Sequence, residues 1–518
     1  MMTGANLQDL QSDFQTVQLE IVQTNVNSKD ASQKYFLRTS TVSEYKTRLD
    51  LVPEVDNTFN QPATASTFTL TTLRQYTLDY FYTLFLPTGY PDSVTPDYTA
   101  YQIYDSLQAF ASSIAGLLSS RAVLQSLNVV ASSTLDSSAK GLPAPGSPEA
   151  ATYATILSVA QNTISNLTTI FFAARVAPRI NAEVKYYRFL ADIANDAAFV
   201  LDLLAPSLPT SFETTTLPAL TYIPISPRVI ALCTSSGLRA VCGVASSSKS
   251  VLSAHFARNN PAQLGDLNAK DGSQETVINL IGMWVGGVVV SRVDGFVATW
   301  IWMIGLLITH LSMNYMAVKS VRLRSLNKTR LEGVYAKHDA VGGRAPSVDE
   351  IGREEPILHF RGWLASRLRL RSREPIIRLG VPFSEFHQVW MSQNSTRSLD
   401  KLTTHRKYIV LYSPAYRRNT ALILLEQSAR PQDHLKAYLS ALEGLNPSKT
   451  GSKTSGQNSL TESSLHDREQ AQIRDQLDEY LDAILVQLQR AGWDLSATTL
   501  GDEGYRVGFN DQSLKKNS

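Results

Sequence analysis

Cysteine is almost absent from this chain of 518 residues, which contains only Cys233 and Cys242. Two cysteines build neither a disulfide framework nor a four-ligand zinc site. Both lie among small residues, and we interpret them as packed between helices, because a free cysteine behaves as a small apolar residue. We accordingly expect no metal and no cofactor.

Common catalytic motifs are also lacking. The sequence has no Gly-x-Ser-x-Gly elbow, no glycine-rich phosphate loop and no paired histidine ligands. Ser246 and Lys249 have the Ser-x-x-Lys spacing of some acyl-transfer enzymes, but the partner motifs of those enzymes are missing. The arginines within 361–373 are not interleaved with stacking aromatics, so nothing indicates a nucleic-acid partner. These absences favour a non-enzymatic protein.

The first residues contain no basic segment followed by an apolar run, so we expect no secretory signal. Residues 1–65 are polar, and we expect a weakly ordered leader with a strand or helix near Lys34–Arg38. The sequence does not indicate a compartment.

The bulk composition allows a sizeable core and a small membrane part. Hydrophobic residues make up 43% and charged residues 18% of the chain, with a net charge of +2. A mean hydropathy of −0.11 argues against a chain that lies mostly in lipid. The length predicts two or three domains.

Residues 66–330 have apolar side chains at helical spacing, which predicts a mainly α domain of six or more helices. Three prolines within 87–96 predict a rigid loop. The helices are expected at 68–85, 99–135, 150–176, 180–204 and 228–254.

The strongest physical signal is the apolar hairpin 277–318. Its second half is long enough to cross a bilayer core, which needs about 20 apolar residues. His310 and Asn314 lie in that half and should face other helices. Gly282 and Gly286 form a small-xxx-small face. Basic residues flank both ends, which favours two passes over one. The alternative is a buried hairpin in a soluble helical core.

The remaining sequence has a different texture. We interpret the charged interval 331–375 as a basic linker, whose arginines either contact anionic lipid or are solvated. Residues 376–518 predict a small soluble α+β domain with a flexible insert at 446–465. Its strands are expected at 407–413, 419–426 and near 505–509, and its helices at 431–444 and 466–490.

Two groups of polar residues are candidates for function. Asp192 and Asp196 share a helix face by their i,i+4 spacing, which suits an acid–base pair, although Lys185 and Arg188 could make it an ordinary salt-bridged face. The segment 269–276 is the second group. There we expect Gly272 to turn the chain, or Asp271 or Ser273 to cap a helix.

Several long strings resemble the root UVB sensitive family, over about residues 68–331 and more weakly in the C-terminal part. They are FLPTGYPDSVTPDYTAYQ at 85–102, DSLQ at 105–108, SSRA at 119–122, HFAR at 255–258, AKDGSQET at 269–276 and THLSMNYMAV at 309–318. The resemblance implies membrane association and, in plants, links to vitamin B6 balance, auxin transport and the response to ultraviolet-B light. It identifies no reaction.

We therefore expect a membrane-associated protein that transports, senses or scaffolds around a small metabolite, with the lipid membrane as partner and a family member or a second copy as a further partner. The alternatives are an enzyme that uses Asp192, Asp196 and Asp271, or an adaptor that acts through its C-terminal domain. The candidate functional residues are Asp97, Tyr98, Gln102, Asp105, Gln108, Arg121, Asp192, Asp196, His255, Arg258, Lys270, Asp271, Gln274, Glu275, His310 and Asn314.

Overall fold

The computed structural model describes residues 19–24, 32–43, 46–53, 82–126, 148–209, 226–258, 260–340, 342–358, 376–393, 407–413, 420–445 and 464–508. The chain divides into two compact units. The first unit comprises Met1–Pro96 and Ala257–Thr276, and the second comprises Asp97–Phe256 and Val277–Ser518.

The first unit contains an antiparallel sheet in the order β1-β2-β3. β1 is Leu19–Thr24, β2 is Ser32–Ser43 and β3 is Lys46–Pro53. β2 covers the place where the sequence predicted a strand or helix. Most of the predicted helix 68–85 lies outside the described residues.

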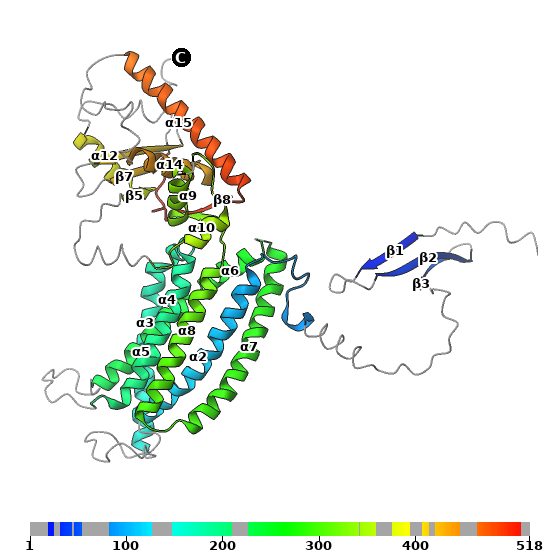
Figure 1. Ribbon diagram of the computed structural model, residues 1–518, viewed down its shortest axis with the longest axis vertical. Coiled ribbons are helices and arrows are strands. Elements are labelled where there is room, and N and C mark those ends of the chain that lie inside the picture. Colours follow the sequence, from blue (N-terminus) through cyan, green and yellow to red (C-terminus); the bar gives the residue numbers. More distant parts are fainter. Residues whose placement is uncertain are drawn as a thin grey trace, which may run out of the picture. The chain divides into compact units, whose positions relative to one another are not determined.

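The second unit begins with a bundle of long helices that run alongside one another (Figure 1). α2 contacts α4 and α8, α4 also contacts α5 and α8, and α3 packs on α5. The mainly α prediction is confirmed. The helices are α2 Tyr98–Ser126, α3 Pro148–Ile180, α4 Val184–Leu204, α5 Pro227–Ala245, α6 Ser248–Phe256 and α8 Phe296–Ser320, joined by the second half of α7.

The helix α7 spans Pro261–Arg292 and begins earlier than the sequence suggested. Asn260 caps its first turn by accepting a hydrogen bond from a backbone N–H at 3.1 Å. Gly272 therefore lies inside a helix, and neither Asp271 nor Ser273 is a cap, so that prediction was wrong. A single glycine costs a helix only about 1 kcal/mol, which the surrounding helix formers tolerate.

Close approach of α7 to α2 depends on two glycines. A Cβ atom on Gly282 would lie 2.7 Å from the Cβ of Ser113, and one on Gly286 would lie 2.7 Å from a methyl of Leu117. The small-xxx-small face therefore packs within the chain. Gly295, with φ +87°, then reverses the chain into α8.

The bundle exposes large apolar side chains on its outside. Trp284 is 75% exposed, Phe171 72% and Val297 69%. Among the described residues, four helices are long and apolar enough to cross a membrane: Tyr98–Ser126, Pro227–Phe256, Pro261–Arg292 and Phe296–Ser320. The apolar hairpin thus accounts for two of them, and the bundle is compatible with a membrane protein.

The C-terminal part is α+β, as predicted. β5, β7 and β6 form a sheet in that order, with β5 parallel and β6 antiparallel to β7. Alternate residues of β7 face α12 on one side and α14 on the other. The elements are β5 Ile376–Leu379, α12 Phe383–Gln393, β6 Tyr408–Ser413, β7 Thr420–Leu425, α14 Pro431–Leu445, α15 Ser464–Arg490 and the parallel pair β4 Ser325–Asn327 with β8 Asp494–Thr499.

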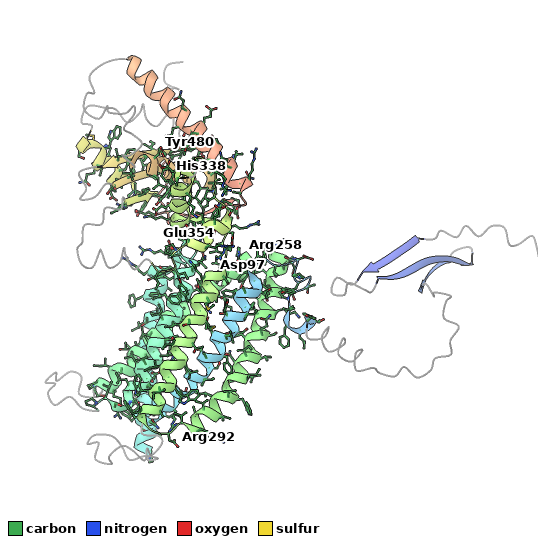
Figure 2. The ribbon with its side chains drawn as sticks, in the orientation of Figure 1. Asp97, Arg258, Arg292, His338, Glu354 and Tyr480 are labelled. Atoms are coloured by element: carbon green, nitrogen blue, oxygen red, sulfur yellow. The ribbon has the colours of Figure 1, made fainter. Side chains whose placement is uncertain are left out.

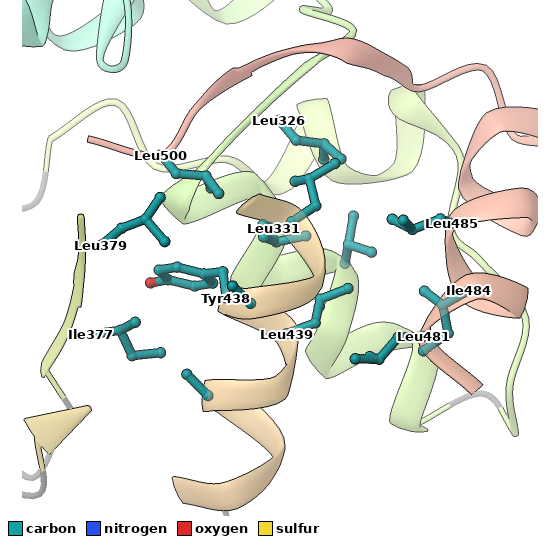
Figure 3. Packing of buried hydrophobic residues seen from close by; sticks show 14 of the residues in the cluster. Leu326, Leu331, Ile377, Leu379, Tyr438, Leu439, Leu481, Ile484, Leu485 and Leu500 are labelled. Atoms are coloured by element: carbon teal, nitrogen blue, oxygen red, sulfur yellow. The ribbon is translucent and has the colours of Figure 1, made fainter. Parts of the chain in front are cut away.

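Part of the expected linker is packed structure. α9 (Lys328–Ala340) and α10 (Val348–Glu354) bury Leu331, Val334 and Ile351 in the same core as α14 and α15. Figure 3 shows this core around Leu331 and Leu439. Charged side chains of this interval such as Asp339, Asp349 and Glu354 are exposed, which gives the short helices the composition of a linker, whereas Glu355 is buried. The arginines at 361–373 lie outside the described residues.

Two further details complete the C-terminal part. The ring of His338 on α9 meets that of Tyr480 on α15 edge-on, with centroids 6.4 Å apart (Figure 2). Instead of the strand expected near 505–509, Val507 forms an isolated bridge with Glu426. β8 supplies the strand at 494–499, which the sequence did not suggest.

Candidate functional site

One face of α4 carries ionisable side chains along its whole length. They recur every three to six residues in a helix that is otherwise apolar, and each is at most 6% exposed. From the first to the last is about 26 Å at 1.5 Å per residue, close to the ~30 Å of a bilayer core. These residues are Lys185, Arg188, Asp192, Asp196 and Asp202.

Arg188 is the centre of the polar contacts. Its guanidinium reaches Asp105 on α2 at 2.7 Å and Asp192 one turn along α4 at 3.1 Å. It also donates to the hydroxyl of Tyr101 at 3.3 Å. Lys249 on α6 approaches Asp105 at 3.5 Å. Arg188 therefore joins carboxylates of two helices.

Two side-chain amides also donate hydrogen bonds to the carboxylate of Asp192. Gln108 on α2 donates to its carboxylate at 2.5 Å, and the amide of Asn314 on α8 donates to the same oxygen. Asn314 also donates to the carbonyl oxygen of Gln108 at 2.9 Å. Three helices therefore meet at one carboxylate. The carbonyl oxygen of Asn314 is buried and has no hydrogen-bond partner among the described residues.

One turn further, Asp196 meets His310. The Nδ1 atom of His310 lies 2.7 Å from Oδ1 of Asp196, and their side chains are 2% and 6% exposed. Because α4 and α8 run antiparallel, Asp192–Asn314 and Asp196–His310 are successive rungs between them. Both oxygens of Asp196 and Nδ1 of His310 are buried without a hydrogen-bond partner in the described structure, so the 2.7 Å contact is an ion-pair distance without hydrogen-bond geometry.

An apolar layer follows along α4. Phe199 and Leu203 pack with Met303 of α8 and with Leu118 of α2. Beyond Phe199, Asp202 belongs to a second polar layer. Along α4, Phe199 of this cluster lies between Asp196 and Asp202, and Leu203 follows Asp202.

The second polar layer contains Asp202, Ser119 and Arg239. Ser119 donates to Asp202 at 2.7 Å, and the guanidinium of Arg239 on α5 contacts the same carboxylate. The Arg239 guanidinium also lies 5.7 Å from the ring centroid of Phe199. This layer pairs one cation with one carboxylate.

The other end of the stripe joins the bundle to the C-terminal part. Lys185 contacts Glu355 at 2.7 Å, and Arg330 on α9 contacts it at 3.0 Å. All three side chains are at most 5% exposed. Burial by itself raises the pKa of Glu355, but the charges of Arg330 and Lys185 outweigh it and hold that pKa below its usual value.

At the same end of the bundle, Asp97, which precedes α2, contacts two other segments of the chain. Its carboxylate lies 3.0 Å from the ring of His255 and accepts a hydrogen bond from the backbone N–H of Arg322 at 2.7 Å. The chain therefore starts α2 and leaves α8 at one end of the bundle. Arg292 marks the opposite end, and Figure 2 labels Asp97 and Arg292 at the two ends.

Other candidate residues take structural roles. The rings of Tyr98 and Phe256 meet edge-on at 5.6 Å, and Gln102 donates to the Tyr98 hydroxyl at 3.4 Å. Arg121 donates to the carbonyl oxygens of Val290 and Val293 at 3.0 and 2.8 Å, which caps the C-terminal end of α7.

The first unit holds the remaining candidates. Arg258 donates to the carbonyl oxygen of Val94 at 2.9 Å. Lys270 and Gln274 donate to backbone carbonyls of the segment 83–85. Asp271 is half-buried and Glu275 is exposed. Within the first unit, Lys270 and Gln274 therefore hold the loop before α2 against α7, and Arg258 contacts the same loop from the segment before α7.

The structure thus brings Asp105, Gln108, Asp192, Asn314 and, one rung further, Asp196 and His310 to the α2–α4–α8 contact. Arg188 pairs with Asp192 at the i,i+4 spacing of the predicted salt-bridged face, but the sequence did not indicate its contacts with Asp105 and Tyr101 of α2. It also missed the second polar layer and the Glu355–Arg330 contact. The recurrence of charge along α4 was the available signal. Lys249, considered as a Ser-x-x-Lys lysine, pairs instead with Asp105.

This arrangement holds several buried charges in balance and offers carboxylate, amide, guanidinium and imidazole groups to a small polar molecule or a proton. In the described part of the chain, no group of three histidine, cysteine or carboxylate side chains could hold a metal ion. Asp271 belongs to the first unit, whereas Asp192 and Asp196 belong to the second.

A helical bundle with an apolar outside and a charged interior, joined to an α+β domain, is the class of protein that this structure defines. A family profile described as a vitamin B6 photo-protection and homoeostasis domain matches residues 71–340, and one described as the root UVB sensitive protein C-terminal region matches residues 345–509. The chain belongs to the root UVB sensitive family.

Named relatives agree with this assignment. RUS family member 1 of Dictyostelium discoideum is 32% identical over 60% of this chain and 51% of its own length, so the chain spans about half of that relative. Protein root UVB sensitive 3 of Arabidopsis thaliana is 28% identical over 69% of this chain and 73% of its own length. Root UVB sensitive 5 of the same plant is 22% identical, over 80% and 74%. No solved structure matches the chain.

Proposed function

We propose that the chain is an integral membrane protein whose bundle moves a small, polar, ionisable metabolite across the bilayer. The observation that carries this proposal is the polar stripe of α4, buried between helices whose outer faces are apolar. Charged side chains at bilayer depth are costly, and they commonly mark pathways for substrates or ions. A bundle that served only as an anchor would gain nothing from five ionisable residues on one buried face.

The same proposal gives a topology. The contact of Asp97 with Arg322 supports an even number of passes, because α2 starts and α8 ends at the same side. That end is rich in basic residues, whereas the end with the α7–α8 turn has Arg121, Arg228 and Arg292. By the positive-inside tendency, the basic end and the C-terminal domain face the cytoplasm. The basic residues of that end are Arg175, Arg179, Lys319, Arg322 and Arg324.

For the cargo we propose a metabolite of the vitamin B6 type. The description of the matching family profile supports this class. A small heteroaromatic ring that carries both donors and acceptors also suits a site with two amides, a guanidinium and carboxylates. On α4 between Asp192 and Asp202 lies Phe199, whose ring could pack on such a heterocycle.

Uptake by proteoliposomes containing the purified full chain tests the proposal. Labelled pyridoxine, pyridoxal and pyridoxamine, with their phosphates, are offered to wild type, to Asp192→Asn and to the matched surface change Asp92→Asn. We expect uptake of at least one vitamer by wild type and by Asp92→Asn, and its loss in Asp192→Asn. Equal accumulation in protein-free liposomes, or extraction of the chain from membranes by alkaline carbonate, would contradict the proposal.

A further inference from the structure

The contact between Asp196 and His310 carries an inference that rests on the proposed function and goes beyond it. Both side chains are almost fully buried, and each is the other's only ion-pair contact among the described residues. Arg188 and Lys249 are in contact with Asp105 and Asp192 instead, and Arg239 of α5 is paired with Asp202. The charge of Asp196 therefore has one available counter-ion, which exists only when His310 is protonated.

The surroundings provide no other positive charge for Asp196. On α4 its ionisable neighbour one turn away is Asp192, itself a carboxylate, and Arg188 follows a turn later. From α2 the nearby groups are Gln108 and Asp105, and α8 adds the amide of Asn314. Cys242 faces this region from α5, and its thiol carries no positive charge. Lys185 lies about 16 Å away by helix rise and is occupied by Glu355.

An isolated ionised carboxylate in an apolar interior costs many kcal/mol, so such groups take up a proton or a counter-ion. Oδ2 of Asp196 and the carbonyl oxygen of Asn314 are buried acceptors without a partner in the described structure. Both lack a hydrogen-bond donor, whereas an anion would supply only more acceptors. The buried acceptor oxygens here therefore require a cation that can also donate a hydrogen bond.

We propose that the Asp196–His310 pair binds one proton, which comes from water and neutralises the pair, and that this proton is the ion coupled to transport. With the proton bound, the second rung holds α4 against α8 as the structure shows. Without it, the buried charge of Asp196 favours separation of the two helices and entry of water. When the proton leaves, the polar residues of α4 between Lys185 and Asp196 then become accessible to water.

Proton binding is measured without any transport assay. Purified full chain in lipid nanodiscs is titrated with pH and followed by infrared difference spectra of carboxyl groups and by ¹⁵N resonances of labelled histidine. The chain has eight histidines, so His310→Gln assigns the resonance, and exposed His387→Gln is the matched control. We expect a protonation signal that disappears in both Asp196→Asn and His310→Gln and persists in His387→Gln.

A signal that survives in either Asp196→Asn or His310→Gln, or that is absent from wild type at every pH, overturns the proton site. A response of the His310 resonance to Na⁺ or K⁺ at fixed pH, with none to pH, also overturns it and assigns the positive charge to a metal cation.

Coupling is measured in the proteoliposomes with and without an imposed pH gradient. Uptake by wild type should rise with the gradient, and this rise should be lost in Asp196→Asn. A wild type that transports equally with and without a gradient overturns the coupling and leaves the proposed function intact. A protonation signal in a protein that transports no vitamer would instead contradict the proposed function and leave the proton site standing.

Discussion

The bundle and the C-terminal domain both bury apolar side chains, but they place their charged residues differently. Inside the bundle, Arg188 and Asp192 pack at the contact of three helices, while Trp284 and Phe171 are exposed. In the C-terminal domain the core is made of side chains such as Ile423 and Leu439, and ion pairs such as those of Arg378 lie at the surface. The buried pair of Arg330 and Glu355 lies at the junction with the bundle. The difference follows from the surroundings for which each part is built. An apolar outside suits lipid, and an interior of charges then requires close pairing.

The largest expected effect comes from the same substitution made in both regions. Arg188→Met leaves Asp105 and Asp192 as buried carboxylates without their shared cation, so the free energy of unfolding should fall by about 3–5 kcal/mol. Arg378→Met removes contacts to Glu385 and Glu503 at the surface and should cost less than about 1 kcal/mol. Chemical denaturation of the full chain in nanodiscs measures both. Equal losses would show that the bundle interior is solvated.

A smaller effect tests how the bundle packs. Gly286→Leu forces a side chain against Ile114 and Leu117 and should destabilise the α2–α7 contact by about 1–3 kcal/mol. Gly287→Leu is the matched control, because no atom lies within 4 Å of a Cβ at that position. Thermal unfolding in nanodiscs compares the two. If Gly287→Leu were as harmful, that face of α7 would contact protein rather than lipid.

The smallest effect concerns the junction of the two regions and appears only in acid. The pKa of Glu355 is lowered from its usual 4.5 by Arg330 and Lys185, although burial opposes them. The ionised form therefore stabilises the folded protein above pH 4.5, and this contribution is lost as the pH falls through the lowered pKa. Hydrogen exchange of α9 and α10 should consequently rise in that window.

The control for this junction is the neighbouring residue. Glu355→Gln should raise the exchange of α9 and α10 at neutral pH and remove its dependence on acid. Glu354→Gln changes a side chain that is 67% exposed and pairs only with Lys337 among the described residues, and it should preserve the wild-type acid response. An unchanged exchange profile in Glu355→Gln would mean that apolar packing alone holds the junction.

The sequence by itself determined the mainly helical character of the bundle, the apolar hairpin, the α+β character of the C-terminal part and the family, but not the start of α7 or the helices α9 and α10. Periodicity and proline positions depend on nearby residues, and these features follow from them directly. It also singled out Asp192, Asp196, His310 and Asn314, because polar groups in apolar helices are conspicuous wherever they occur.

Tertiary structure alone decided which of these residues meet. The i,i+4 spacing places Asp192 and Asp196 on one face of α4, but only the antiparallel packing on α8 pairs them with Asn314 and His310 in successive rungs. A helical period determines which residues share a face, but it does not determine which helix that face contacts, because the contacting residues lie more than 100 positions away, as with Asn314 and Asp192. The contact of Lys185 with Glu355 illustrates the same limit. Local spacing predicted a salt bridge of Lys185 within its own helix, whereas in the folded chain its partner is Glu355 of the C-terminal part.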